Sequence, residues 1–110
     1  MDYAVSLKTF DRFEEARSLM RKTIPIARRI LGEGNELTLT MRWIYAEALY
    51  KDDAATLDDL RESVTALGNT EQTARRVLGC AHPTTKGLEK GLREARAARR
   101  AREAQAPSPS

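Results

Sequence analysis

Cysteine and aromatic residues are scarce in this sequence. It has one cysteine, Cys80, and two Phe, three Tyr and one Trp among 110 residues. One cysteine cannot form an internal disulfide, so we expect a reducing, cytoplasmic environment. No apolar run approaches the roughly 18 residues that a membrane-spanning helix needs. The early acid Asp2 and the lack of an apolar stretch after it are not typical of a signal peptide. We therefore expect no membrane partner.

Charge of one sign is also not in large excess. The net charge is +3, from 19 basic and 16 acidic residues. This excess is too small to indicate a nucleic-acid-binding protein, so we expect no specific nucleic acid partner. Charged residues make up 32% of the chain, and Ala, Leu, Glu and Arg, which favour helices, dominate the composition. The length allows one small domain, which we place at residues 1–104.

The spacing of apolar residues predicts an all-α protein. Gaps of three and four mark amphipathic helices. We predict helices at about residues 2–9, 12–31, 37–51, 55–78 and 83–103, followed by a disordered tail at 105–110. Asp11 and Glu14 have the spacing of a capping box at the start of the second helix, and Pro25 should kink that helix near Arg21.

Local signals mark the other helix ends. Thr56 precedes two acids and resembles a helix start, and Pro83 suits a first turn. Gly32 and Gly79 suit the residue that follows a last turn. We also expect a bend or short break at residues 68–69, where Gly and Asn adjoin.

An internal repeat organises the chain. The sequence Ala-Arg-Arg-Ile-Leu-Gly at residues 27–32 recurs as Ala-Arg-Arg-Val-Leu-Gly at residues 74–79, an offset of 47 residues. A short connector and a threonine-containing helix start follow each copy. Such self-similarity is typical of helical-repeat arrays, in which each antiparallel helix pair buries its apolar face only against the next pair.

These residues resemble a known family. Phe-Glu-Glu-Ala at residues 13–16, the segment 27–32, and Val-Leu-Gly-Cys-Ala-His-Pro-Thr-Thr at residues 77–85 are similar to tetratricopeptide repeats of the kinesin light chain type. The resemblance covers about residues 2–95, with an apparent insertion near residues 52–56. It implies antiparallel helix pairs stacked as a short right-handed tetratricopeptide-like solenoid, whose concave groove binds short peptide segments of partner proteins.

The resemblance also assigns positions. It implies that Ala46 is a small packing residue of a first helix, between the larger Tyr45 and Leu49. The groove-facing places fall on Val5, Lys8, Thr9, Trp43, Glu47, Tyr50 and Lys51. Of these we take five as candidate partner-binding residues, namely Lys8, Trp43, Glu47, Tyr50 and Lys51. The light-chain family carries a pair of asparagines in the first helix, and this chain has Trp43 and Ile44 in those places, which argues against cargo recognition of the light-chain kind.

The helix at 37–51 carries two apolar stripes, and two interpretations of Trp43 and Tyr50 stay open. A surface helix needs one stripe. The second stripe, which includes both residues, is either covered by a neighbouring helix or free for a ligand. Aromatic side chains are frequent anchors at interfaces, and they are also frequent in cores.

The basic residues near the C-terminus suggest a second function. Five arginines, offset by two glutamates, fall within residues 93–103, namely Arg93, Arg96, Arg99, Arg100 and Arg102. Such a helix is either a solvated surface or a site for a polyanion.

No chemistry is indicated elsewhere. Cys80 and His82 are too few for a zinc site, and no third group completes a nucleophile. We therefore expect a scaffold that binds a protein or peptide partner, with no catalytic, metal or cofactor site. The alternative is a basic adaptor that binds nucleic acid or another polyanion through the last helix. Because repeat arrays generally need about three units, we also expect self-association through exposed repeat ends.

Overall fold

Four helices make up the described structure. The computed structural model describes residues 2–52 and 54–105, with side chains from residue 12 onward. The helices are α1 (Asp2–Leu31), α2 (Glu36–Tyr50), α3 (Leu57–Leu78) and α4 (Pro83–Gln105). This described part contains no strand, which confirms the predicted all-α class. None of the four helices combines the length and apolar character that a membrane crossing requires.

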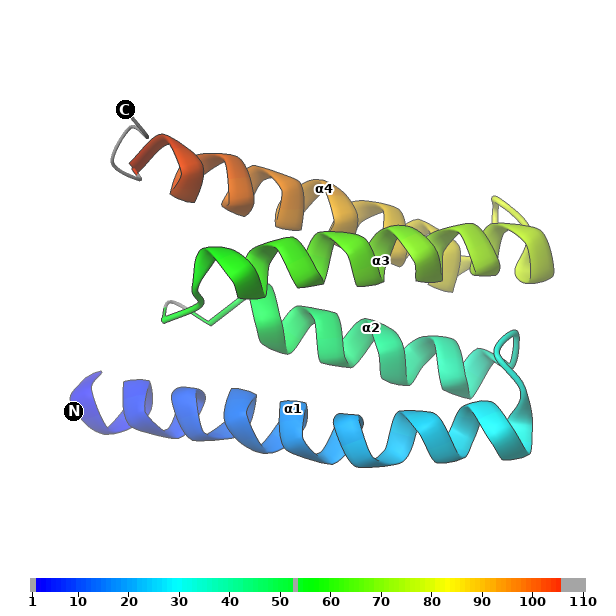
Figure 1. Cartoon of the computed structure of the whole chain (residues 1–110), viewed down its shortest axis with the longest axis horizontal. Coiled ribbons are helices and arrows are strands. Elements are labelled where there is room, and N and C mark those ends of the chain that lie inside the picture. The colour runs from blue at the N-terminus through cyan, green and yellow to red at the C-terminus, as the bar shows by residue number, and fades with distance from the viewer. Residues whose placement is uncertain (1, 53, 106–110) are drawn as a thin grey trace.

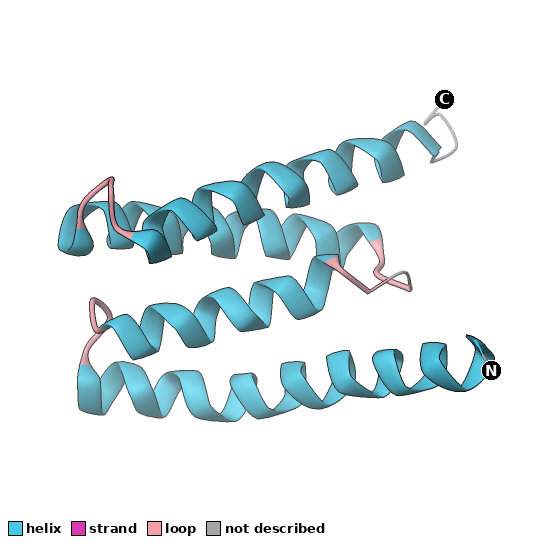
Figure 2. Cartoon of the chain, turned by 180° about the vertical axis from the view of Figure 1, so that it is seen from behind, coloured by secondary structure: helices cyan, strands magenta, loops and turns pink. Residues whose placement is uncertain are grey.

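Consecutive helices run antiparallel and lie side by side (Figures 1 and 2). Each helix packs on the next one along the chain, and α2 also contacts α4. Among the described residues α1 and α3 share no such contact. The stack is therefore closed on one side, where α2 meets α4, and open on the other, where α1 and α3 stay apart.

The first helix differs from the sequence-based prediction. Two helices were expected, at 2–9 and 12–31, but α1 is continuous from Asp2 to Leu31. The backbone of Asp11 lies inside α1, so the predicted capping box is not a helix start. No Gly or Pro occurs between residues 9 and 12, and continuing a helix costs less than nucleating a new one. α1 also continues on both sides of Pro25, and its N-terminal part extends past the end of α2 (Figure 1).

The bend expected at residues 68–69 is absent as well. α3 runs without a break from Leu57 to Leu78. Leu67 and Thr70 on either side of this pair are fully buried, so packing holds both flanks in one helix. The cost of an interior glycine, about 1 kcal/mol, is small against this burial.

The predicted disordered tail at 105–110 overlaps α4 by one residue, because Gln105 is the last residue of that helix. Residues 106–110 lie outside the described residues.

The helices α1 and α3 end in the same way. Gly32 and Gly79 each have a φ of 93°, a conformation that residues with a Cβ rarely adopt. The Gly32 N–H donates to the Arg28 carbonyl and the Gly79 N–H donates to the Arg75 carbonyl, each over 3.1 Å. The repeated sequence therefore forms a repeated hydrogen-bond pattern.

The helices that follow these connectors also begin alike. Asn35 Oδ1 accepts a hydrogen bond from the Leu37 N–H at 2.9 Å, and His82 Nδ1 accepts one from the Thr84 N–H at 3.1 Å. Each side chain satisfies a backbone donor that the first helical turn leaves free. The 47-residue repeat is thus a repeat of structure as well as of sequence.

The core lies between α2, α3 and α4. Its buried residues are Leu39, Ala46, Val64, Leu67, Ala74, Leu88 and Ala95, and Trp43, Tyr50, Ala66, Leu78 and Leu92 pack against it. At the middle of the stack, the buried Ser63 Oγ donates to the carbonyl of Ala46 at 2.9 Å. α1 joins α2 through Met20, Ile24 and Ala27, each 9% exposed or less.

Candidate peptide-binding groove and a second pocket

Four of the five residues predicted to bind a partner line one groove between α2 and α4. We call it the inner groove; its volume is about 290 Å³. Its lining residues are Trp43, Glu47, Tyr50 and Lys51 from α2 and its C-cap, and Gly87, Lys90, Gly91 and Glu94 from α4. The α2 residues share a face because their spacing of three and four follows the helical period. The fifth residue, Lys8, is in α1, and its side chain lies outside the described residues.

Trp43 packs against two glycines of α4. A Cβ at Gly87 would lie 2.3 Å from Trp43 Cη2, and one at Gly91 would lie 3.5 Å from Nε1. The indole therefore occupies the space that side chains would fill. Trp43 is packed against a neighbouring helix and is also part of the groove lining, and its role in binding a ligand stays a prediction.

The rim of the inner groove is polar and its charges balance. The Tyr50 hydroxyl donates to Glu94 Oε2 at 3.2 Å, and Lys51 Nζ lies 2.7 Å from Glu47 Oε2. Burial raises the pKa of the Tyr50 hydroxyl, and the carboxylates of Glu94 and Glu47 raise it further. The hydrogen bond to Glu47 raises the pKa of Lys51. With Lys90, the groove carries two cations and two anions, so it presents hydrogen-bonding groups without a net charge.

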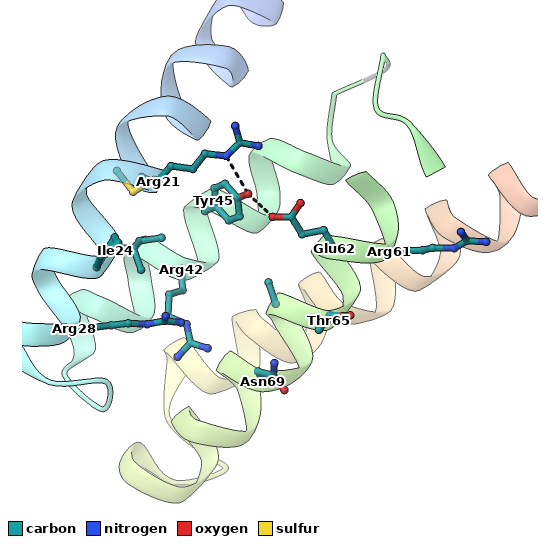
Figure 3. A pocket seen from close by; sticks show the side chains of 12 residues that line it. Arg21, Ile24, Arg28, Arg42, Tyr45, Arg61, Glu62, Thr65 and Asn69 are labelled. Carbon is teal, nitrogen blue, oxygen red and sulfur yellow. Dashed lines mark hydrogen bonds between the residues drawn. The ribbon is translucent and has the colours of Figure 1, made fainter. Parts of the chain in front are cut away.

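A larger hollow lies on the opposite face of α2. We call it the outer pocket; it has a volume of about 560 Å³ and lies between α1 and α3 (Figure 3). Its lining residues are Met20, Arg21, Ile24, Pro25, Arg28, Arg42, Tyr45, Arg61, Glu62, Thr65, Ala66 and Asn69. None of these was a candidate from the sequence.

A hydrogen-bonded chain crosses one end of the outer pocket. Arg21 Nε donates to the Tyr45 hydroxyl at 3.4 Å, and this hydroxyl donates to Glu62 (Figure 3). The chain links α1, α2 and α3. Burial and the bond to Glu62 raise the pKa of Tyr45, and the bond to Tyr45 raises that of Arg21. The three side chains are therefore engaged with one another.

One signal in the sequence could have indicated the outer pocket. Arg28 lies three residues before the end of α1 and Arg42 six residues after the start of α2, so both are close to the turn at residues 32–35. In an antiparallel helix pair, residues of both helices that are close to the connecting turn lie near one another. Two arginines at such positions indicate a local concentration of positive charge.

The connector between α3 and α4 holds the cysteine and the histidine of the chain. His82 caps α4 through Nδ1, and its Nε2 is 4.0 Å from Glu36 Oε1. Cys80 is an exposed free thiol. In the part of the chain that the structure describes, no group of three or more His, Cys, Asp or Glu side chains could hold a metal ion.

Comparisons with protein-family models, with curated proteins and with solved structures give no match for this chain.

Proposed function

We propose that this chain is a non-catalytic scaffold that binds a short peptide segment of a partner protein in the inner groove. The fold that we propose for it is a short right-handed solenoid of the tetratricopeptide type, which the sequence resembles in its repeat and its connectors. In this arrangement α2 and α4 are the inner helices and α1 and α3 the outer ones.

The contacts between helices support this arrangement. In a curved stack of helix pairs, helices on the concave side are closer together than those on the convex side. α2 contacts α4 directly, and α1 makes no such contact with α3 among the described residues. The side on which α2 meets α4 is therefore the candidate concave surface.

The convergence of the predicted contact residues carries the proposal. Trp43, Glu47, Tyr50 and Lys51 were selected from the sequence, and all four line the inner groove. A flat indole surface offers apolar contact at a low cost in conformational entropy. The surrounding hydroxyl, carboxylate and ammonium groups can pair with the N–H and C=O groups of an extended peptide.

A displayed library of random heptapeptides tests this function. We expect peptides that bind the chain to lose about tenfold in affinity on Lys90→Glu, since this change removes a donor and places three acids around the groove. Trp43→Ala should weaken them further. The matched control is Lys22→Glu, because Lys22 is exposed on α1 and lines neither the inner groove nor the outer pocket. The affinity of the peptides for this variant should not change.

Salt dependence gives a second criterion. A charge-balanced groove releases few counterions, so affinity should change less than threefold between about 50 and 200 mM salt. If no heptapeptide is enriched, or if enriched peptides tolerate both Lys90→Glu and Trp43→Ala, the inner groove is not a peptide site.

One observation favours the second candidate, a polyanion-binding adaptor. Exposed basic side chains follow α4 at intervals of three and four residues, namely Lys86, Lys90, Arg93, Arg96 and Arg100. Arg99, by contrast, is only partly exposed, and its Nε lies 3.4 Å from Glu103. Heparin binding that falls steeply with salt and is lost on Arg93→Glu/Arg100→Glu would support this candidate.

A further inference from the structure

The outer pocket faces away from the inner groove, and the proposed peptide site makes no use of it. Arg42 and Tyr45 of α2 line the outer pocket, whereas Trp43 and Glu47 of the same helix line the inner groove. The volume of the outer pocket, about 560 Å³, is within the range of small-ligand sites and has room for a few side chains of a partner.

The lining of the outer pocket is strongly basic. It contains four arginines and one acid, Glu62. Arg21 and Glu62 are both bonded to Tyr45. Arg61 lies 3.8 Å from Asp58, and both side chains are exposed, so this pair is weak. At the other end of the pocket, Arg28 and Arg42 have one carboxylate near them, that of Glu33.

Arg28 and Arg42 form a pair of like charges. Their side chains point toward each other at one end of the pocket (Figure 3). Arg28 Nε is 3.5 Å from the exposed Glu33. Arg42 is half-buried and has no carboxylate within 4.0 Å among the described residues. Burial lowers the pKa of Arg42 and the charge of Arg28 lowers it further. The carboxylate of Glu33 acts in the opposite direction. Arginine stays protonated at neutral pH, so two cations beside one acid leave this end of the pocket with a net positive charge.

An apolar surface adjoins this cation pair. Met20 and Ile24 are each 9% exposed, and with Pro25 and Ala66 they line the same pocket. The pocket thus combines two guanidinium groups, which can bind a carboxylate through two parallel hydrogen bonds, with a surface suited to an aliphatic side chain.

We propose that the outer pocket is a second binding site, which takes an acidic, aliphatic segment of a partner protein. A carboxylate of the segment binds between Arg28 and Arg42, and a neighbouring Leu, Ile or Met side chain packs on Met20 and Ile24. The proposal does not depend on the inner groove.

The same features argue against a nucleic acid in this pocket. Base recognition uses exposed aromatic faces, and Tyr45 is the single aromatic residue of the lining. Its hydroxyl is bonded to Glu62 and Arg21, and the Arg21 guanidinium carbon is 5.9 Å from its ring centre. The aliphatic side chains of the lining have no donor or charge that could bind the phosphates of a nucleic acid.

The test selects random hexapeptides on the Lys90→Glu variant, in which the inner groove is altered and the outer pocket is intact. We expect enriched peptides with Asp or Glu next to Leu, Ile or Met. Their affinity should fall about tenfold on Arg42→Gln and on Arg28→Gln. Arg29→Gln is the matched control, because it removes the same charge from an exposed neighbour on α1 that does not line the pocket.

Stability measurements separate binding from a structural role. Arg42→Gln removes a partly desolvated charge beside a like charge, so the Tm of the free chain should stay the same or rise while peptide affinity falls. Arg42→Lys keeps the charge and loses the paired hydrogen-bond geometry, so it should restore only part of the affinity.

Several results would overturn the proposal. These are the absence of enriched peptides, enriched peptides without acids, and binding that Arg28→Gln/Arg42→Gln leaves unchanged. Binding of polyuridine RNA that depends on Arg42, without peptide binding, would assign the pocket to nucleic acid instead. If no peptide is enriched on the Lys90→Glu variant, and peptides enriched on the unaltered chain lose affinity through Lys90→Glu but not through Arg42→Gln, the inner groove alone is supported, so the two proposals can fail separately.

Discussion

The contact between Trp43 and Gly87 gives the sharpest test of how α2 and α4 pack. An alanine at Gly87 would place its Cβ 2.3 Å from Trp43 Cη2 and 2.7 Å from Cζ2. Carbon atoms in contact are normally about 3.5–4.0 Å apart, so the indole must move by more than about 1 Å. Such overpacking costs about 1–3 kcal/mol. Alanine is better than glycine inside a helix by about 1 kcal/mol, which offsets part of that cost.

Gly68 is the matched control for this substitution. It also lies inside a helix, but a Cβ there would meet no atom within 4 Å. Gly68→Ala should therefore stabilise the chain by about 0.5–1 kcal/mol, whereas Gly87→Ala should destabilise it or leave it unchanged. The free energies of unfolding of the two variants should differ by about 1–3 kcal/mol, the cost of the overpacking. Urea unfolding measures both values.

Tryptophan fluorescence reports on the same contact, because Trp43 is the single tryptophan of the chain. Displacement of the indole toward solvent in Gly87→Ala should shift its emission to longer wavelength, and Gly68→Ala should leave the emission unchanged. Replacing Trp43 by Leu in the Gly87→Ala background should recover about 1–3 kcal/mol in a double-mutant cycle. Equal stabilisation by both alanines, with unchanged emission, would show that Trp43 does not rest on α4.

Three further predictions concern helix starts, pH and association. Asn35→Ala and His82→Ala each remove a helix cap and should lower the free energy of unfolding, measured in urea, by about 1 kcal/mol. His82→Asn should retain most of the stability, since asparagine caps the helix at the equivalent position. A loss in His82→Asn equal to that in His82→Ala would contradict the capping role. Burial and Glu94 raise the pKa of Tyr50. The free energy of unfolding that Tyr50 contributes is therefore complete below the unfolded pKa of about 10 and is lost as the pH rises above that value, because the tyrosine of the unfolded chain ionises first. In urea titrations, Tyr50→Phe should reduce this loss of stability at alkaline pH. Ile26 and Ile30 are 49% and 74% exposed, and Ile26→Lys/Ile30→Lys should reduce the self-association that we expect by sedimentation; a wild-type chain that stays monomeric at high concentration would refute this expectation.

Local chemistry explains which helix boundaries were predictable. Thr56 and Asp59 form a reciprocal capping box, and the backbone at Gly32 and Gly79 has positive φ. Each depends on a few adjacent residues, so the sequence indicates it directly. The continuity of α1 through Asp11 and of α3 through Gly68 depends on packing over the whole helix, and local signals at those points predicted the wrong result.

The functional sites were predictable to different degrees. The helical period alone brings Trp43, Glu47 and Tyr50 to one face of α2, so that half of the inner groove followed from the sequence. The other half, from Gly87 and Gly91, depends on which helix packs on that face. Their spacing of four within a predicted helix was a usable sign of close approach, because interior glycines are costly. The outer pocket joins three helices, and apart from the two arginines near the turn between α1 and α2, no short pattern in the sequence indicates it.

The matching connectors have a consequence for how this architecture can change in length. Because Asn35 and His82 start their helices alike, and Gly32 and Gly79 end theirs alike, a segment cut between equivalent points of the two connectors leaves compatible ends. A duplication or deletion of 47 residues, the spacing of Gly32 and Gly79, would lengthen or shorten the stack by one helix pair. Each helix end would still be followed by the connector and the helix start that belong to it. A cut between points of the two connectors that are not equivalent would separate a helix stop from the helix start that belongs to it.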